Sequence, residues 1–215
     1  MKIIEQMVSE GRGQLAKSGQ MIMSPYDFEK LCRAHLLDNP KASFIHVLII
    51  LTCSKSGHEW TDVIKISKAL GLKNSNVLSQ KKIEPSKKLG FVETRMVDAV
   101  NGLSKHQLRI TEQVHLVSVD SYDGLKMQKM HKYLTDLIEP ESRLMMTPLA
   151  GLILIAIHIR NLKLTKHINN YIGGDVTLWQ ARIKIMQKMA VAGQLVMKEI
   201  ARGAKAKFCV TPITE

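Results

Sequence analysis

Two stretches of this chain share one pattern of apolar residues and glycines. The first reads TDVIKISKALGLKNSNVLSQKKIEPSKKLG over residues 61–90, and the second reads TKHINNYIGGDVTLWQARIKIMQKMAVAG over residues 165–193. In each, a short helical pattern ends at a glycine, and a second helical pattern runs 19 residues further to another glycine. An offset of 103 residues relates Gly71 and Gly90 to their counterparts in the second stretch. Because glycine commonly follows the last turn of a helix, each stretch predicts two helices joined by a turn, and the shared spacing predicts an internal repeat.

A β-hairpin is expected after each pair of helices. In the first copy, Phe91–Val97 alternates loosely between apolar and polar residues, an Asn-Gly pair marks a turn, and His106–Thr111 returns. In the second copy, Leu195–Ile200 and Lys205–Val210 flank a shorter turn that contains glycine. Alternating segments separated by such turns are typical of paired antiparallel strands. Each copy therefore predicts helix, turn, helix and hairpin, in that order.

An apolar helix is expected ahead of each copy. These helices span Ala42 to about Ser54 and Pro148 to Ile159. Both are much shorter than the roughly 20 apolar residues that cross a bilayer, so they are expected to be buried in the protein. The first residues place Glu5 where a signal peptide needs an apolar core. We therefore expect no membrane segment and a cytoplasmic location.

Most of the positive charge lies in the two repeated regions. Residues 61–110 carry ten Lys and Arg against four Asp and Glu, and residues 158–210 carry ten against two. The whole chain has a formal net charge of +12. Such an excess implies a polyanionic partner, either nucleic acid or an anionic membrane surface. Because the excess is confined to two repeated units, it argues against a generically basic protein.

The residue types needed for catalysis or metal binding do not come together in the sequence. Cys32, Cys53 and Cys209 are isolated, and no Cys-x-x-Cys pair is present, so neither a zinc site nor a disulfide framework is indicated. The chain contains no glycine-rich phosphate loop, paired-carboxylate site or nucleophile elbow. We therefore expect no enzymatic activity, no cofactor and no metal.

The sequence predicts a mainly α-helical fold with small β-hairpin wings, built as two tandem winged helix-turn-helix domains. Residues 1–23 are expected to form an arm or a short helix. The first domain covers residues 24–140, with a helix at each end, over residues 24–37 and 121–139. The second, smaller domain covers residues 141–215.

The stretch from Ile45 to Thr111 resembles the winged-helix domain of MarR-type transcriptional regulators. The resemblance lies in the GFVE entry into the hairpin at residues 90–93, in Asp98 on the strand, and in the LRIT exit at residues 108–111. It implies that residues 24–37 and 121–139 build a homodimer interface. The tandem arrangement is similar to the double-domain Sar-type regulators and, more loosely, to plasmid replication initiators. The sequence departs from the MarR pattern at the wing tip, where NGLSK replaces the acidic-arginine signature.

In a winged helix, the second helix of the motif enters the major groove, and the wing reaches the minor groove or phosphates. In the second copy, Trp179, Ile183, Met186 and Ala190 follow helical spacing and are expected to face inward. The opposite stripe carries amide and ammonium groups that can pair with bases or phosphates, although an ordinary solvated face is the alternative. The residues of this copy expected to contact DNA are Thr177, Gln180, Lys184, Gln187 and Lys188 on the helix and Arg202, Lys205 and Lys207 on the wing.

The first copy has a proline in its expected recognition helix. Pro85 removes a backbone donor and costs about 3 kcal/mol in a helix interior, so the helix is expected to end or kink there. For its amide side chains, groove reading and a capping or surface role stay equally open. The residues of this copy expected to contact DNA are Lys73, Asn74, Asn76, Ser79, Gln80, Lys81, Lys82, Lys87 and Lys105.

These features together predict a nucleoid-associated protein that binds double-stranded DNA and regulates transcription by occupying a promoter. Two other functions stay open. One is a replication-initiation or partition protein of a mobile element, which binds repeated sites. The other is a winged-helix adaptor that binds protein and whose basic faces are incidental. The sequence identifies neither the operator nor a small-molecule effector.

Overall fold

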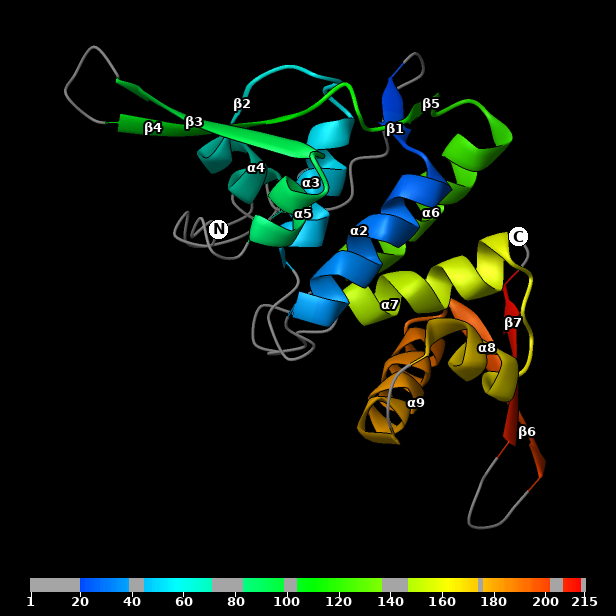
Figure 1. Cartoon of the computed structure of the whole chain (residues 1–215). Coiled ribbons are helices and arrows are strands. Elements are labelled where there is room, and N and C mark those ends of the chain that lie inside the picture. Colours follow the sequence, from blue (N-terminus) through cyan, green and yellow to red (C-terminus); the bar gives the residue numbers. More distant parts are fainter. Residues whose placement is uncertain are drawn as a thin grey trace, which may run out of the picture.

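Helices form most of the described part of the chain, and three small antiparallel sheets complete it (Figure 1). This agrees with the mainly helical class with small hairpins that the sequence predicts. The computed structural model describes residues 20–38, 45–70, 83–98, 104–136, 147–173, 176–201 and 207–213.

Over its described residues, the first half of the chain contains four helices that precede a hairpin, and a further strand and helix that follow it. The elements in order are β1 (Met21–Met23), α2 (Pro25–Asp38), α3 (Ile45–Ser54), β2 (Thr61–Asp62), α4 (Val63–Ala69), α5 (Glu84–Lys88), β3 (Val92–Asp98), β4 (Ser104–Ile110), β5 (Leu116–Ser118) and α6 (Tyr122–Asp136).

The second half is smaller and contains helices followed by one hairpin. Its elements are α7 (Thr147–Leu154), which continues as a single π-helical stretch, η3 (Ile155–Ile159), then α8 (Thr165–Ile172), α9 (Val176–Val191), β6 (Leu195–Ala201) and β7 (Lys207–Pro212). The apolar helix expected over residues 148–159 is thus α-helical only to Leu154.

The two halves connect their strands in the same way. In the first half the strand order is β2-β4-β3, and Thr61 of β2 lies opposite Leu108 of β4. In the second half β6 pairs with β7, and Leu164, just before α8, forms an isolated antiparallel bridge with Cys209 of β7. Leu164 follows Thr61 by 103 residues, the same offset that relates the glycines. An upstream segment therefore pairs with the returning strand of the hairpin in both halves.

Local signals in the sequence account for several helix ends. The Ser24 hydroxyl accepts a hydrogen bond of 3.3 Å from the Asp27 backbone N–H and so caps α2, with Pro25 at its first position. The Ser121 hydroxyl accepts one of 3.1 Å from the Gly124 N–H at the start of α6. Helix α8 ends at Gly173, whose φ of 75° favours glycine.

The N-terminal region and the start of α4 differ from the sequence prediction. Met21–Met23, expected in an arm or short helix, form a strand that pairs with the unpredicted β5. Residues 1–19 lie outside the described residues. Thr61 was expected to open a helix, but Thr61 and Asp62 form β2 and the helix starts at Val63. Both differences arise from pairing with distant strands, which local periodicity does not report.

Pro85 lies in the first turn of a short helix, not in the interior of a long one. Helix α5 begins at Glu84 with Ile83 as its N-cap residue. In a first turn the backbone N–H has no partner within the helix, so proline loses nothing there. The sequence predicts that a helix ends or kinks at Pro85, and in the structure a short helix begins one residue before it. Residues 71–82 lie outside the described part of the chain.

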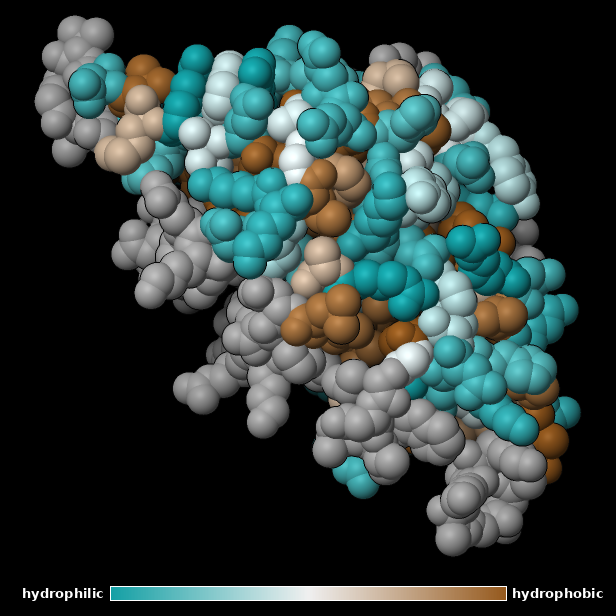
Figure 2. Space-filling view, in the orientation of Figure 1, coloured by the Kyte–Doolittle hydropathy of each residue, from teal (hydrophilic) through white to brown (hydrophobic). Residues whose placement is uncertain are grey.

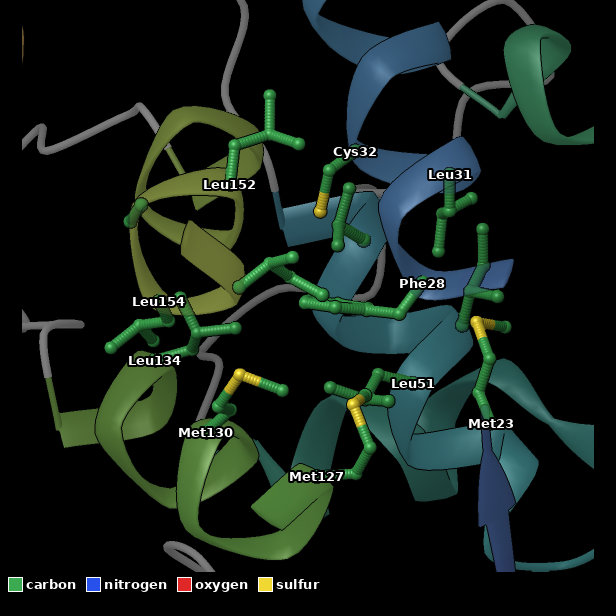
Figure 3. Close-up of a cluster of buried hydrophobic side chains, with 14 of the residues drawn as sticks. Met23, Phe28, Leu31, Cys32, Leu51, Met127, Met130, Leu134, Leu152 and Leu154 are labelled. Atoms are coloured by element: carbon green, nitrogen blue, oxygen red, sulfur yellow. The ribbon is translucent and has the colours of Figure 1, made fainter. Parts of the chain in front are cut away.

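The buried apolar residues of both halves form one cluster. Figure 3 shows Phe28 and Cys32 of α2 beside Leu152 and Leu154 of α7, with side chains of α3 and α6 below them. Gly151 lets α2 and α7 approach closely, because a Cβ at this position would lie 2.6 Å from Cys32 Sγ and 3.1 Å from Phe28 Cζ. The two halves therefore pack against each other where α2 and α7 cross, and we call this crossing the joint between them.

A polar group is also buried in the first half. His131 of α6 lies 3.2 Å from the Thr52 hydroxyl of α3, measured from its Nε2. Burial, together with the nearby charge of Lys55, lowers the pKa of His131 to about 3. Burial likewise lowers the pKa of Lys55 to about 8. The histidine is therefore neutral in the folded protein at neutral pH.

The two hairpins lie at opposite ends of a bowed molecule (Figures 1 and 2). Hairpin β3–β4 extends at the upper left of Figure 1 and β6–β7 at the lower right, with α2 and α7 between them. In this view α4, α5 and α9 lie toward the inner side of the bow. The outer side, at the upper right of Figure 2, is mostly hydrophilic.

Candidate nucleic-acid interface

Helix α9 carries an exposed polar stripe opposite a buried face. Four of the predicted DNA contacts are exposed along one side of this helix: Gln180, Lys184, Gln187 and Lys188. On the opposite side, Arg182, Ile185, Met186 and Met189 are buried. Side chains separated by three, four and seven residues share a face of an α-helix, which is why the stripe is continuous. Two amides and two ammonium groups are thus presented together on one face.

The buried face differs in part from the predicted one. Met186 is fully buried, and Ile183 and Ala190 pack against the core while remaining partly exposed. The buried face is centred on Arg182 and Met189, so it is rotated by roughly a fifth of a turn from the predicted direction. The side chains of Trp179 and of the predicted contact Thr177, in the first turn of α9, lie outside the described residues.

Arg182 is a residue that the sequence analysis missed. Its side chain is fully buried, and its guanidinium binds backbone oxygens at the end of α8. Nη1 donates to the backbone oxygen and to Oδ1 of Asn169, both at 3.2 Å, and Nη2 donates to the Gly173 oxygen. Arginine is almost never fully buried unless it is paired, so helical periodicity alone places it on a solvent face. Only the position of the α8 carbonyls identifies its role.

The hairpins present basic residues near both ends of the molecule. Lys105 is exposed on β4, opposite Val97 of β3. Lys207 begins β7 opposite Ala201, and its side chain lies outside the described residues. The other predicted wing contacts, Arg202 and Lys205, fall in residues 202–206, which also lie outside.

Most residues of the first copy that were predicted to contact DNA lie between α4 and α5, in residues 71–82. Lys87 lies in the last turn of α5 and is half-buried, and the neighbouring Lys88 is exposed. The remaining candidates lie outside the described residues: Lys73, Asn74, Asn76, Ser79, Gln80, Lys81 and Lys82.

The outer face of the first sheet carries an arginine and tryptophan cluster that the sequence analysis did not identify. The Trp60 ring lies beneath Arg95 and Arg109, with their Cζ atoms 4.2 and 4.8 Å from its centroid. Arg95 Nε donates to Gln107 Oε1 at 2.8 Å, and Arg109 is paired with Glu93 at 2.8 Å. The Gln107 Nε2 also donates to Asp62 Oδ1 of β2 at 2.7 Å, so side-chain contacts join all three strands of the sheet and brace the hairpin. In the sequence, Glu93 and Arg95 are two residues apart on β3, and Gln107 and Arg109 are two residues apart on β4. Residues at this spacing on paired strands can lie on the same face of a sheet, which is the signal that could have identified the cluster.

Over the described residues, no three His, Cys, Asp or Glu side chains meet as they would around a metal ion. Within the same ranges, no helix has the length and apolar character needed to cross a membrane. No protein-family model matches the chain, and no curated protein or solved structure matches it significantly.

Proposed function

We propose that this protein binds double-stranded DNA through two tandem winged-helix units, within residues 24–140 and 141–215, and regulates transcription by occupying a promoter. The observation that carries the proposal is the exposed stripe of Gln180, Lys184, Gln187 and Lys188, which stands directly opposite the buried face of α9. Glutamine can pair with adenine through two hydrogen bonds, and lysine can reach guanine or phosphate. A recognition helix needs this combination on its outward face.

The connectivity around α9 supports a winged-helix unit. A segment that bridges to the hairpin at Leu164 is followed by α8, α9, β6 and β7. The first half has the corresponding bridge at Thr61, with α4, α5, β3 and β4 after it. In winged-helix proteins this order places the second helix in the major groove and the hairpin beside it.

The arrangement of the two units supports one extended binding site. The hairpins lie at the two ends of the bow, and α9 lies toward its inner side together with α4 and α5 (Figure 1). The net charge of +12 favours attraction of the chain to phosphates. One chain would then cover two successive contact regions of a duplex.

A homodimer through α2 and α6 is a further part of the proposal. Tyr26 on α2 and Tyr122 and Leu125 on α6 are large exposed side chains on these helices. Tyrosine is enriched in protein interfaces, where it contributes both apolar area and a hydroxyl. Light scattering at micromolar concentration should give about twice the 24.2 kDa chain mass. A mass equal to one chain would contradict the dimer and favour two units acting within one monomer.

The DNA-binding test uses a duplex selected by the protein from a random library and a random duplex of equal length. Affinity for both should fall steeply with salt, because roughly 6–10 phosphate contacts lose about 10³- to 10⁵-fold in affinity between 50 and 200 mM salt. Gln180→Ala and Gln187→Ala should each weaken binding to the selected duplex by about 1–3 kcal/mol, with little change for the random one. Fluorescence anisotropy measures both quantities.

Gln113→Ala is the matched control, because Gln113 is an exposed glutamine on the turn between β4 and β5. It should leave both affinities unchanged. A flat salt response would contradict DNA binding and leave a protein-docking role for these helices. Unchanged specificity in both glutamine variants would show that α9 does not read sequence. Each variant must first show the thermal unfolding of the unmodified protein.

A further inference from the structure

Two arginines from different helices converge on the C-terminal end of α8. Arg33 of α2 donates from Nη2 to the Tyr171 oxygen at 3.1 Å and from Nη1 to the Ile172 oxygen at 3.3 Å. Arg182 of α9 donates to the next carbonyl, that of Gly173. Three consecutive carbonyls, which have no partners within a helix that ends there, therefore accept from guanidinium groups. The C-terminal end of a helix is also where positive charge is favoured by the helix dipole.

Arg33 is held in this position from three sides. Glu29, one turn earlier on α2, accepts from Arg33 Nε at 3.0 Å. The same carboxylate accepts from Arg160 Nη2 at 3.1 Å, and Arg160 directly follows η3 in the second half. The Arg33 guanidinium also lies over the Tyr171 ring, with Cζ 5.0 Å from its centroid. Burial acts to raise the pKa of Glu29, but its interactions with Tyr171, Arg33 and Arg160 outweigh it and lower that pKa.

We propose that Arg182 and Arg33 are positioning residues for the DNA-contacting helix: Arg182 fixes α9 against the end of α8, and Arg33 ties that end of α8 to α2 of the first unit. This inference rests on the proposed DNA-binding function of α9. The direction in which α9 presents its exposed stripe therefore depends on how α9 is held against the end of α8. Arg182 holds α9 to the end of α8 from within, and Arg33 holds the same end of α8 to the other half of the chain.

The chemistry requires arginine and not merely a positive charge. A planar guanidinium offers several N–H donors in a fixed fork, so one side chain can bind two carbonyls at once. Lysine carries a single ammonium on a flexible stem and holds no such geometry. The conservative replacement of Arg33 by lysine therefore keeps the charge and loses part of the positioning.

The test compares Arg33→Gln, Arg33→Lys and Arg182→Met with the unmodified full chain on the selected and random duplexes. Arg33→Gln should reduce the preference for the selected duplex by about tenfold, the factor expected from losing a hydrogen bond to a charged group. Binding to the random duplex should stay within about twofold, because Arg33 lies on α2 and phosphate contacts carry nonspecific affinity. Arg33→Lys should recover part of the preference, and Arg182→Met should lose at least as much as Arg33→Gln.

Lys30→Gln is the matched control, since it removes one positive charge from the exposed side of the same helix, where Lys30 lies over Tyr26 at 4.4 Å. Because Lys30 lies on a helix proposed for the homodimer, the comparison is made where light scattering gives the same mass for Lys30→Gln and the unmodified protein; the preference should then be unchanged. Amide hydrogen exchange gives a second measurement without DNA: Arg33→Gln should speed exchange over residues 165–191, whereas Lys30→Gln should not.

The possible outcomes separate the two proposals. If Arg182→Met does not fold, Arg33→Gln decides the question, because Arg33 is about one-third exposed and its loss leaves the core intact. An unchanged preference in folded Arg33→Gln overturns the positioning role. If the unmodified protein prefers no duplex, the proposed function fails. Whether Arg33 and Arg182 hold the end of α8 is then decided by amide hydrogen exchange alone. Unchanged exchange over residues 165–191 in Arg33→Gln overturns it in that case as well.

Discussion

Each half of the chain buries a basic side chain, and the two are held in opposite ways. In the first half, His131 lies between α6 and α3 beside the Thr52 hydroxyl, and burial lowers its pKa to about 3. In the second half, Arg182 keeps its charge because a guanidinium does not lose its proton in proteins. Its charge is matched by backbone carbonyls at the end of α8.

The two buried side chains respond differently to a change in pH. A neutral buried histidine becomes unfavourable when acid forces a proton onto it, so the first half contains a group that titrates. Arg182 donates to oxygens of Asn169 and Gly173 that carry no charge and do not titrate. The site of His131 is therefore expected to be sensitive to acid, while the site of Arg182 is expected to be sensitive to the loss of hydrogen-bond geometry.

The largest expected effect is an acid-dependent loss of stability that depends on His131. Its pKa is about 3 in the folded protein against an ordinary value of 6.5, so between these values the unfolded chain binds more protons. Stability is thus complete above about pH 6.5 and falls as the pH is lowered toward 3. The loss should reach on the order of 2 kcal/mol by about pH 5. Urea unfolding at a series of pH values measures it.

His131→Gln should flatten this pH dependence, because glutamine can still hydrogen-bond to Thr52 but does not titrate. A residual slope is expected at lower pH from His158, whose pKa burial and the charges of Lys129 and Lys126 lower to about 4. His167→Gln is the control, since His167 is exposed on α8. If His131→Gln kept the full pH dependence of the unmodified protein, the assignment to His131 would be wrong.

The next effect concerns the joint that connects the two halves. In Gly151→Ala, the new Cβ would lie 2.6 Å from Cys32 Sγ and 3.1 Å from Phe28 Cζ, so α2 and α7 must separate or a side chain must move. Such overpacking typically costs about 1–3 kcal/mol. Chemical denaturation of Gly151→Ala, Cys32→Ala and the double variant forms a double-mutant cycle. Partial recovery in the double variant is expected, and strict additivity would contradict a direct contact.

The order of elements could be predicted because its signals are local. The helix expected from Thr165 is observed as Thr165–Ile172, because Gly173 supplies the positive φ that ends it. The exposed stripe of α9 followed from helical spacing in the same way, and Gln180 and Lys184 lie where that spacing places them. A pattern of 3.6 residues reports which side chains share a face before any tertiary contact is known.

The remaining features depend on partners that are distant in the sequence. Strand β1 forms because Met21–Met23 pairs with residues 116–118. Three residues are too few to show the alternation that predicts a strand. Arg182 is buried because α8 ends beside it, so its carbonyl partners come from another helix. Pro85 interrupts a helical pattern in the sequence, yet in the structure it marks the start of α5. For β1 and Arg182 a tertiary partner overrides the local signal, whereas Pro85 is accepted because it lies in the first turn of a helix.

The smallest expected effect tests whether only the first hairpin is braced by side chains. Trp60→Leu removes the ring beneath Arg95 and Arg109, whose exposed cation–π contacts contribute about 0.5–1 kcal/mol each. Amide exchange in β3 and β4 should therefore become several-fold faster, by roughly fivefold for each kcal/mol lost, while β6 and β7 should not change. Tyr26→Leu removes a comparable contact, that of Lys30, away from either hairpin, and should leave both unchanged. Equal loosening of the two hairpins by Trp60→Leu would mean that the ring acts on overall stability and not as a local brace.

Unchanged exchange in β3 and β4 would mean that the backbone pairing of Thr61 with Leu108 is enough to hold the first hairpin. The first hairpin would then be held as the second one is, where Leu164 forms an isolated bridge with Cys209.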